Sequence, residues 1–190
     1  MRAAQVSSTS LVRYRSNDYS VPTTHGHRSV TVKGFVDEVV ILAGSEEIAR
    51  HSRSYERGAF VFDPLHYLAL IEQKPGALDQ AAPLQGWELP DEFGHLRRLL
   101  EARLGNKGKR EFIQVLRLME VLDQNLVALA VARAIKLGAL SFDAVKQIAV
   151  ARLERRPPQL DLERYPHLPK ANVAVTRAAD YAALMPAGTR

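Results

Sequence analysis

Short runs of β-branched and aromatic residues, separated by turn residues, fill residues 11–64 and constrain the fold more than any other feature of the sequence. Most of these runs are too short for a helix. In the first run the apolar residues Val12 and Tyr14 alternate with arginines, which is the period of two expected of a strand. Small strands protect their edges best when they curl into a closed structure. The pattern therefore predicts a small all-β barrel at residues 10–62.

A helical period replaces this pattern after residue 62. Asp63 and Pro64 suit the N-cap and the first position of a short helix, and residues 74–76 (Lys-Pro-Gly) end it. Beyond them, apolar residues recur every three or four positions, as in amphipathic helices. These repeats lie in residues 95–104, 111–122, 126–137 and 142–153. We expect a mainly helical region at residues 63–156 with an irregular linker at 77–90, and hence an α+β fold.

The segment 126–137 is apolar on almost every side, so we expect it to be the most buried helix, covered on every face. The cover is expected from residues 157–190 or from another subunit. Prolines punctuate residues 157–190, which we interpret as an extended tail. Residues 1–9 are interpreted as a flexible lead-in.

Composition excludes several classes of protein. The sequence contains no cysteine, which rules out disulfides, zinc–thiolate sites and thiol nucleophiles. It has no run of about 20 apolar residues and no signal-peptide pattern at its start, so we expect a cytoplasmic protein without a membrane span. The formal net charge of +5 favours a polyanionic partner, but only weakly.

Motifs for small-molecule chemistry fail on inspection. Gly105 and Gly108 are separated by two residues, whereas a phosphate-binding loop needs four. His25 and His27 flank a glycine without a carboxylate partner at ligand spacing, which favours a surface loop over a metal site. No serine lies in a nucleophile-elbow motif. We therefore expect no metal and no cofactor.

Basic residues recur along the predicted barrel and are the candidate DNA-binding residues. Two alternatives remain open for them: a grip on a phosphate backbone, or ordinary surface charge diluted by neighbouring acidic residues. The basic residues are Arg13, Arg15, Arg28, Lys33, Arg50, Arg53 and Arg57. The acidic residues among them are Asp18, Asp37, Glu38, Glu46, Glu47 and Glu56.

Several segments in collinear order carry a resemblance to a known family. They are YRSNDYSVP (residues 14–22), IARHSRSY (48–55), FDPLHY (62–67), QKPGAL (73–78), FIQVLRL (112–118) and AADY (178–181). Through them, residues 12–185 resemble the C-terminal part of IstA-type insertion-sequence transposases, which are relatives of the phage Mu transposase and of retroviral integrases.

The resemblance implies a function. In this family a recognition domain and an RNase H-like core, with three metal-binding acidic residues, precede a small β-barrel and a helical region. The core cuts and joins DNA, the barrel contacts transposon DNA, and a AAA+ helper ATPase assists. This sequence starts at the barrel, so we expect it to lack the catalytic carboxylates and not to be an enzyme.

The expected function is that of a non-catalytic C-terminal fragment of an insertion-sequence transposase, which binds DNA and supports assembly of the transposition complex. The expected partners are transposon-end DNA, bound mainly through its backbone, the AAA+ helper ATPase and further copies of the chain. The alternative is a protein–protein interaction module for the ATPase or for self-assembly, with little DNA affinity. A third alternative, a small phosphotransfer enzyme, is disfavoured because no carboxylate cluster is evident.

Overall fold

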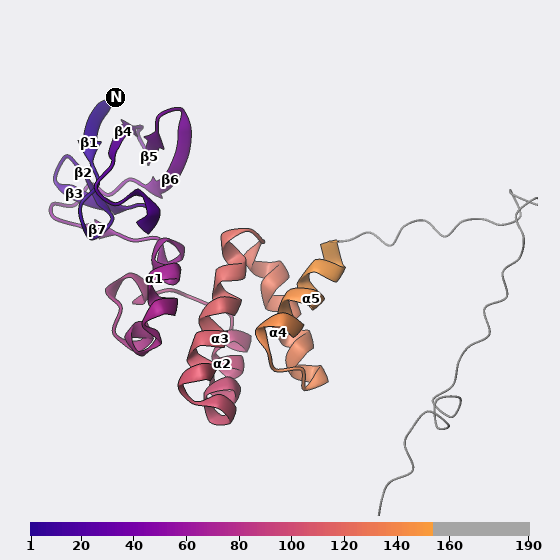
Figure 1. The fold of residues 1–190 in the computed structure, drawn as a ribbon. Helices are drawn as coiled ribbons and strands as arrows, with labels where there is room; N and C mark the ends of the chain where they lie inside the picture. The colour runs from indigo at the N-terminus through magenta and orange to yellow at the C-terminus, as the bar shows by residue number, and fades with distance from the viewer. Residues whose placement is uncertain (154–190) are drawn as a thin grey trace, which may run out of the picture. The chain divides into compact units, whose positions relative to one another are not determined.

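A computed structural model of the chain describes residues 1–153, which belong to one compact unit. Seven strands precede five α-helices, and five short 3-10 helices connect them (Figure 1). The strands are β1 (Arg2–Gln5), β2 (Leu11–Tyr14), β3 (Asn17–Ser20), β4 (Ser29–Gly34), β5 (Glu38–Ala43), β6 (Glu46–Ser52) and β7 (Phe60–Val61). The α-helices are α1 (Leu68–Gln73), α2 (Asp91–Leu104), α3 (Asn106–Arg117), α4 (Gln124–Leu137) and α5 (Phe142–Leu153). The 3-10 helices are η1 (Thr23–His25), η2 (Pro64–Tyr67), η3 (Pro75–Asp79), η4 (Ala82–Leu84) and η5 (Leu118–Glu120). The α+β class is confirmed.

The strands form two sheets, and no closed barrel is found among the described residues. One sheet has the order β1-β4-β5-β6 and is antiparallel throughout. The other has the order β2-β3-β7, in which β3 and β7 are parallel. The barrel prediction was wrong in this respect, because β1 takes the place beside β4 and leaves β2 to pair with β3. Both sheets still contribute to one apolar core, with Val12 and Tyr19 from the second and Val32 and Ile41 from the first.

Residues 1–9 are not a flexible lead-in. Arg2–Gln5 forms β1 and pairs with β4 in the register Arg2↔Val32, and Val6 is buried in the core between the sheets. The prediction was wrong because Arg-Ala-Ala-Gln has little strand propensity of its own. Pairing with β4 overrides that weak local preference.

The short helix after the strands begins as predicted. Asp63 caps it, and its Oδ1 accepts a hydrogen bond from the Leu65 backbone N–H at 2.9 Å, with Pro64 in the first position. Residues 77–90, predicted as an irregular linker, contain the end of η3 and the whole of η4. Leu78 of η3 is buried in the helical core, and Trp87 packs against that core.

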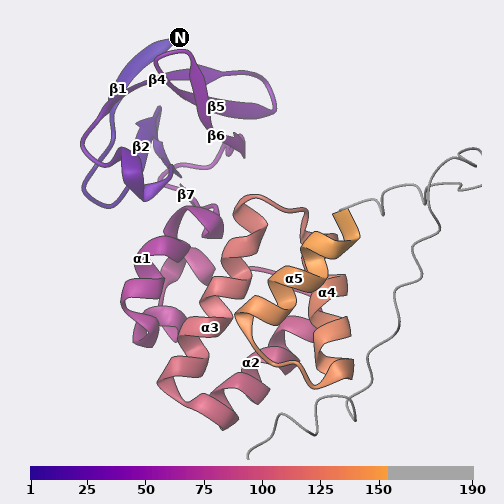
Figure 2. The ribbon, with the colours of Figure 1, turned by 45° about the vertical axis from the view of Figure 1, so that its right-hand side comes forward.

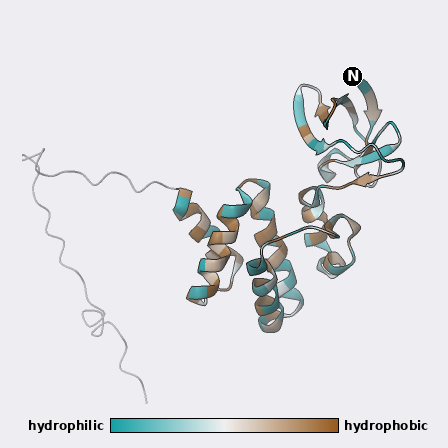
Figure 3. Ribbon diagram, turned by 180° about the vertical axis from the view of Figure 1, so that it is seen from behind, coloured by the Kyte–Doolittle hydropathy of each residue, from teal (hydrophilic) through white to brown (hydrophobic). Residues whose placement is uncertain are grey.

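Helices α2 and α3 pack side by side, as do α4 and α5 (Figure 2). Gly108 permits the first of these contacts, because a Cβ atom there would overlap the backbone carbonyl of Leu100. Brown and teal alternate along the helices in Figure 3, as expected of amphipathic elements with one buried face. Within residues 1–153 no helix is both long and apolar enough to cross a membrane.

Helix α4 is less buried than its composition predicts. It ends at Gly138 in the left-handed conformation, as expected, but Leu129 and Leu137 are more than half exposed. Only one face is buried, since alanine supplies much of the apolar character and Val127, Ala130, Val131 and Ala134 fall on one side. Helix α3 has more buried residues. The predicted cover by residues 157–190 lies outside the described residues.

Candidate nucleic-acid interface

The seven basic residues selected from the sequence differ in the partners of their side chains. Arg13 on β2 lies opposite Asp18 on β3, and its guanidinium donates to both oxygens of that carboxylate, at 3.0 and 2.6 Å. The hydrogen bond and the charge of Asp18 raise the pKa of Arg13. Asp18 is largely buried, and the guanidinium of Arg13 neutralises its charge within the chain.

Arg50 on β6 is engaged in a similar way. Its guanidinium bonds both oxygens of Glu47, at 2.9 and 2.8 Å, and one oxygen of Glu38, at 2.5 Å. Lys33 on β4 and Arg50 both lie opposite Val40 of β5, so the two cations flank a valine on one sheet face. This face carries two cations beside two carboxylates and is a weak candidate for an anion.

Arg28 is exposed and lies between η1 and β4. Its backbone carbonyl accepts from the Val6 N–H at 2.9 Å, which ties this segment to β1. Within residues 1–153 no hydrogen bond joins Arg28 to the other six basic residues.

The remaining three arginines lie, with two aromatic residues, in three loops that hydrogen bonds join to one another. We call this set, Arg15, Phe35, Arg53, Tyr55 and Arg57, the arginine–aromatic end. Arg53 is the centre of the set: its guanidinium donates to the Phe35 carbonyl at 2.6 Å and lies over the Tyr55 ring, 4.5 Å from the centroid. None of the three arginines forms an ion pair with a carboxylate within residues 1–153.

Backbone contacts hold these loops against one another. The turn between β4 and β5 is joined to the loop after β6 by Tyr55, whose hydroxyl donates to the Val36 carbonyl at 2.6 Å, and by the Arg53 N–H, which donates to the Asp37 carbonyl at 2.8 Å. The turn between β2 and β3 joins the same loop through the Gly58 N–H, which donates to the Ser16 carbonyl at 3.1 Å.

Two strand residues, Asn17 of β3 and Gly34 of β4, help to fix the positions of these loops. Asn17, which is buried, donates to the Ser54 carbonyl at 2.9 Å and accepts from the Ala59 N–H at 3.0 Å. Gly34 is required at the end of β4, because a Cβ atom there would overlap the Tyr14 ring. The loops are therefore held in place before any ligand binds.

Exposed apolar side chains distinguish this end from an ordinary charged surface. Phe35, Val36 and Tyr55 are exposed by 50%, 72% and 69%. Sequence reasoning did not select them as site residues. A signal was present, because Phe35 and Val36 occupy a turn between two strands where polar residues are usual. Asp37 and Glu56 lie in the same loops and lower the local positive charge.

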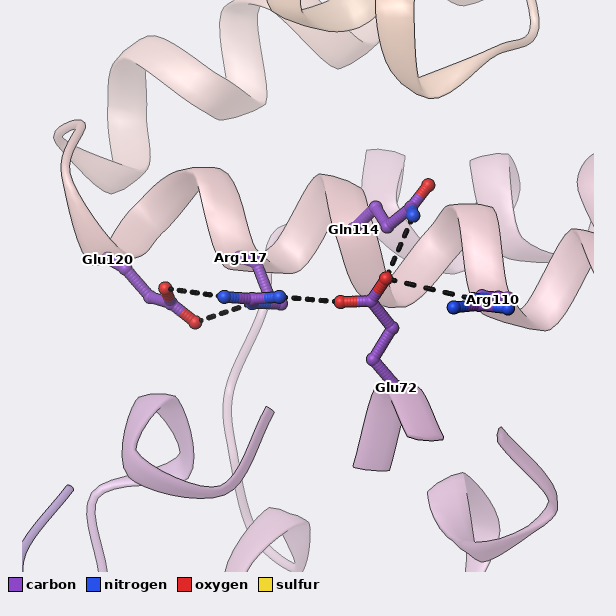
Figure 4. Close-up of polar contacts among 5 residues, drawn as sticks. All are labelled: Glu72, Arg110, Gln114, Arg117 and Glu120. Carbon is purple, nitrogen blue, oxygen red and sulfur yellow. Dashed lines mark hydrogen bonds and ion pairs between the residues drawn. The ribbon is translucent and has the colours of Figure 1, made fainter. Parts of the chain in front are cut away.

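Two arginines of the helical region, Arg110 and Arg117, lie beside carboxylates (Figure 4). Glu72 of α1 accepts from Arg117 at 2.6 Å and from Gln114 at 2.8 Å, and Arg110 lies 3.7 Å away. Burial raises the pKa of Glu72, but these donors outweigh it and the pKa is lowered overall. Arg117 also bonds Glu120 at 2.9 Å. The network joins α1 to α3, and the charges of Arg110 and Arg117 are largely balanced by those of Glu72 and Glu120.

A second ion-pair network joins η3 to the helices. Asp79 bonds Arg97 of α2 and Lys109 of α3, and Arg97 also bonds Glu101 at 2.6 Å. The hydrogen bonds from Arg97 and Lys109 lower the pKa of Asp79 to about 2. These cations stabilise the packing of the helices.

Ser20, His66 and Asp63 form a contact series that superficially resembles a hydrolase triad. Ser20 Oγ and His66 Nδ1 are 2.9 Å apart, and His66 Nε2 is 3.6 Å from Asp63 Oδ2. Ser20 is completely buried, however, and its hydroxyl accepts from the Asp63 N–H at 2.8 Å. A substrate cannot reach this hydroxyl, so the series joins β3 to η2 and is structural.

His51 belongs to the same buried cluster. Its Nε2 lies 2.6 Å from the Ser20 carbonyl, and its ring is 5.7 Å from that of His66. Burial lowers the pKa of both histidines, to about 4 for His66. Across residues 1–153, no group of three or more His, Asp or Glu side chains is placed to hold a metal ion.

Comparisons with known proteins give the chain a context. Residues 1–63 match the family model of the Mu transposase, C-terminal domain. Over 159 residues the chain is 35% identical to the transposase for insertion sequences IS1326/IS1353 of Pseudomonas aeruginosa, and equally to that of Shigella flexneri. Over 180 residues it is 34% identical to a transposase of Aminobacter aminovorans.

These alignments cover most of this chain but a minor part of each relative. They span 81% of the chain and 30% of the IS1326/IS1353 transposases, and 89% of the chain and 35% of the Aminobacter protein. The chain thus spans about a third of the length of these curated relatives. No solved structure matches it significantly.

Proposed function

We propose that this chain, which is related to the C-terminal part of IstA-type insertion-sequence transposases, binds DNA during transposition and supports assembly of the transposition complex. The similarity supports a role in transposition. The finer assignment, to DNA binding, rests on the geometry of the arginine–aromatic end. DNA of the transposon ends is the proposed partner.

One observation supports this assignment more than any other: the joined loops of the arginine–aromatic end carry three arginines without a carboxylate partner within residues 1–153. A guanidinium without a carboxylate is available to a phosphate, and phosphate contacts supply most of the sequence-independent affinity for DNA. We therefore propose Arg15, Arg53 and Arg57 as the main backbone contacts. Arg28 and Lys33 are proposed as weaker, outer contacts, and Arg13 and Arg50 as the weakest, because carboxylates already hold them.

The proposal is tested by measuring affinity of the full chain for two duplexes of equal length and unrelated sequence. We expect similar affinities, since backbone contacts carry no sequence information, and a steep fall in affinity as salt is raised. Absence of measurable binding at low salt would overturn the proposal and favour a protein-interaction module.

We also propose that this chain does not cut DNA. The matched family model is a C-terminal domain, and the resemblance assigns strand cutting to a separate core. Element-end DNA incubated with the chain and Mg²⁺ should remain intact. Specific nicking that EDTA abolishes would contradict this statement.

The helical region is the proposed contact for protein partners, namely the AAA+ helper ATPase and further copies of the chain. Its support is the exposure of Leu129 and Leu137 on α4. Light scattering on the full chain, alone and with the ATPase, should show association that the Leu129→Ser/Leu137→Ser variant reduces. Unchanged association would place the contact elsewhere.

A further inference from the structure

The arginine–aromatic end exposes more apolar surface than contacts to phosphates require. Phe35, Val36 and Tyr55 are large apolar side chains that are exposed by half or more. They lie in two loops separated by some 20 residues of sequence, yet the Tyr55 hydroxyl bonds the Val36 carbonyl directly. The exposed rings are therefore displayed by a fixed framework.

The framework also combines a ring with a cation. The Arg53 guanidinium lies over the Tyr55 ring at 4.5 Å while its Nη1 is held by the Phe35 carbonyl at 2.6 Å. A planar guanidinium beside aromatic rings is the combination that proteins use to stack nucleic-acid bases, whose faces are exposed only when the bases are unpaired.

A hollow of about 710 Å³ adjoins the turn between β4 and β5. The charges that line it indicate whether a base or a phosphate would bind there. Phe35 and Val36 line it together with Asp37, Glu38 and Arg50. Arg50 bonds Glu38 at 2.5 Å, so Asp37 is the carboxylate of this hollow that has no ion pair within residues 1–153. Asp37 disfavours a phosphate there and can accept a hydrogen bond from the amino group of a base, as Asp and Glu do from cytosine.

We propose that the arginine–aromatic end binds an unpaired nucleotide of DNA, with its base stacked on Phe35 and Tyr55 and its phosphates beside Arg15 and Arg57. The proposal rests on the DNA-binding function proposed above and narrows it to a substrate class, DNA with an unpaired segment. Blunt duplex uses the arginines alone, whereas an unpaired nucleotide uses both the arginines and the rings.

The test compares three DNA probes with the full chain: a blunt duplex, the same duplex with a three-nucleotide overhang, and a single strand of equal length. Fluorescence anisotropy should show the overhang bound about tenfold more tightly than the blunt duplex, because stacking of an unpaired base on an aromatic ring adds binding free energy. Phe35→Leu and Tyr55→Leu remove the rings and keep apolar volume. Each should abolish most of this preference. Phe35→Leu should change the affinity for blunt duplex less than about twofold, whereas Tyr55→Leu also removes the ring under Arg53 and should weaken blunt-duplex binding as well.

Two variants serve as matched controls. Phe60→Leu removes an aromatic ring that is exposed by 59% on β7, outside the set, and should keep the preference. Tyr55→Trp should keep it too, and its fluorescence should be quenched by the overhang. The quenching reports stacking directly, even if a leucine variant proves unstable by circular dichroism.

Equal affinity for blunt and overhang DNA, or a preference that survives both leucine variants, would overturn the proposal. If blunt duplex still bound with steep salt dependence, the proposed DNA-binding function would stand and only the unpaired-nucleotide proposal would fail. If no probe bound, both the DNA-binding function and the unpaired-nucleotide proposal would fail. Self-association of the chain that Phe35→Leu abolishes would assign the rings to a protein contact and would also overturn the inference.

Discussion

Two arginines of the helical region and the three arginines of the arginine–aromatic end have different partners. In the helical region Arg97 and Arg117 each bond two carboxylates, and these pairs connect α1, η3, α2 and α3. At the arginine–aromatic end, Arg53 is held by a carbonyl and a ring, and Arg15 and Arg57 have no carboxylate partner in the part of the chain that the structure describes. Arg97 and Arg117 thus stabilise the fold, whereas the arginines of the arginine–aromatic end remain available to a ligand.

The number of basic residues in a region therefore does not tell which of them are free of a carboxylate partner. Arg13 and Arg50 belong to the strand region, yet they resemble the arginines of the helices because each bonds a carboxylate. What distinguishes a candidate ligand contact is the partner of the guanidinium. The first prediction below concerns the contact between the two regions, and the later ones test this distinction.

The largest expected effect is on stability at acid pH, through the buried histidines that join β3 and β6 to η2. An unfolded histidine binds a proton below about pH 6.5, whereas folded His66 does so only near pH 4. The unfolded state therefore binds more protons between these values. Stability should be fully present above pH 6.5 and should fall by up to about 3 kcal/mol as pH drops to 4. Urea unfolding at a series of pH values measures this loss.

His66→Asn provides the control for that prediction. Asparagine retains a polar atom near Ser20 Oγ but does not titrate, so the loss of stability over the same pH range should be clearly smaller. An identical pH profile for the variant and the wild type would show that His66 is not responsible.

The next effect separates structural arginines from ligand-binding ones in the helical region. Glu72→Gln removes the charge that Arg110 and Arg117 share and should lower the free energy of unfolding by about 1–2 kcal/mol. DNA affinity should not decrease. Glu120→Gln, which affects a more exposed carboxylate on the same Arg117, should have a smaller effect on stability. Equal effects of the two variants would mean that the contact between α1 and α3 is not held by Glu72.

The smallest effect concerns Arg13. Because it bonds Asp18, Arg13→Gln should lower the melting temperature slightly and change the salt dependence of DNA binding little. Arg57→Gln should do the reverse, with unchanged melting temperature and weaker binding. If Arg13→Gln weakened DNA binding as much as Arg57→Gln, a carboxylate partner would not distinguish the two classes of arginine.

Sequence reasoning succeeded where the signal is local. The N-cap Asp63 with Pro64, and the left-handed Gly138 after α4, are signals within a few residues of the element they bound. It failed for β1, whose pairing partner lies some 25 residues away. The pairing of Arg13 with Asp18 depends on strand register, and hence on structure that charge counting does not include. The meeting of Phe35 with Arg53 depends on two loops whose contact no periodicity reveals.

The most direct test of the central distinction is the slope of log affinity against log salt concentration for duplex DNA. Arg15→Gln/Arg57→Gln removes two charges from the arginine–aromatic end, and Arg133→Gln/Lys136→Gln removes two exposed charges from α4. The first variant should flatten the slope by up to about 2 units, since each lost phosphate contact accounts for about 0.9, and the second should leave it unchanged. Equal flattening by both variants, or by neither, would contradict the assignment of the interface.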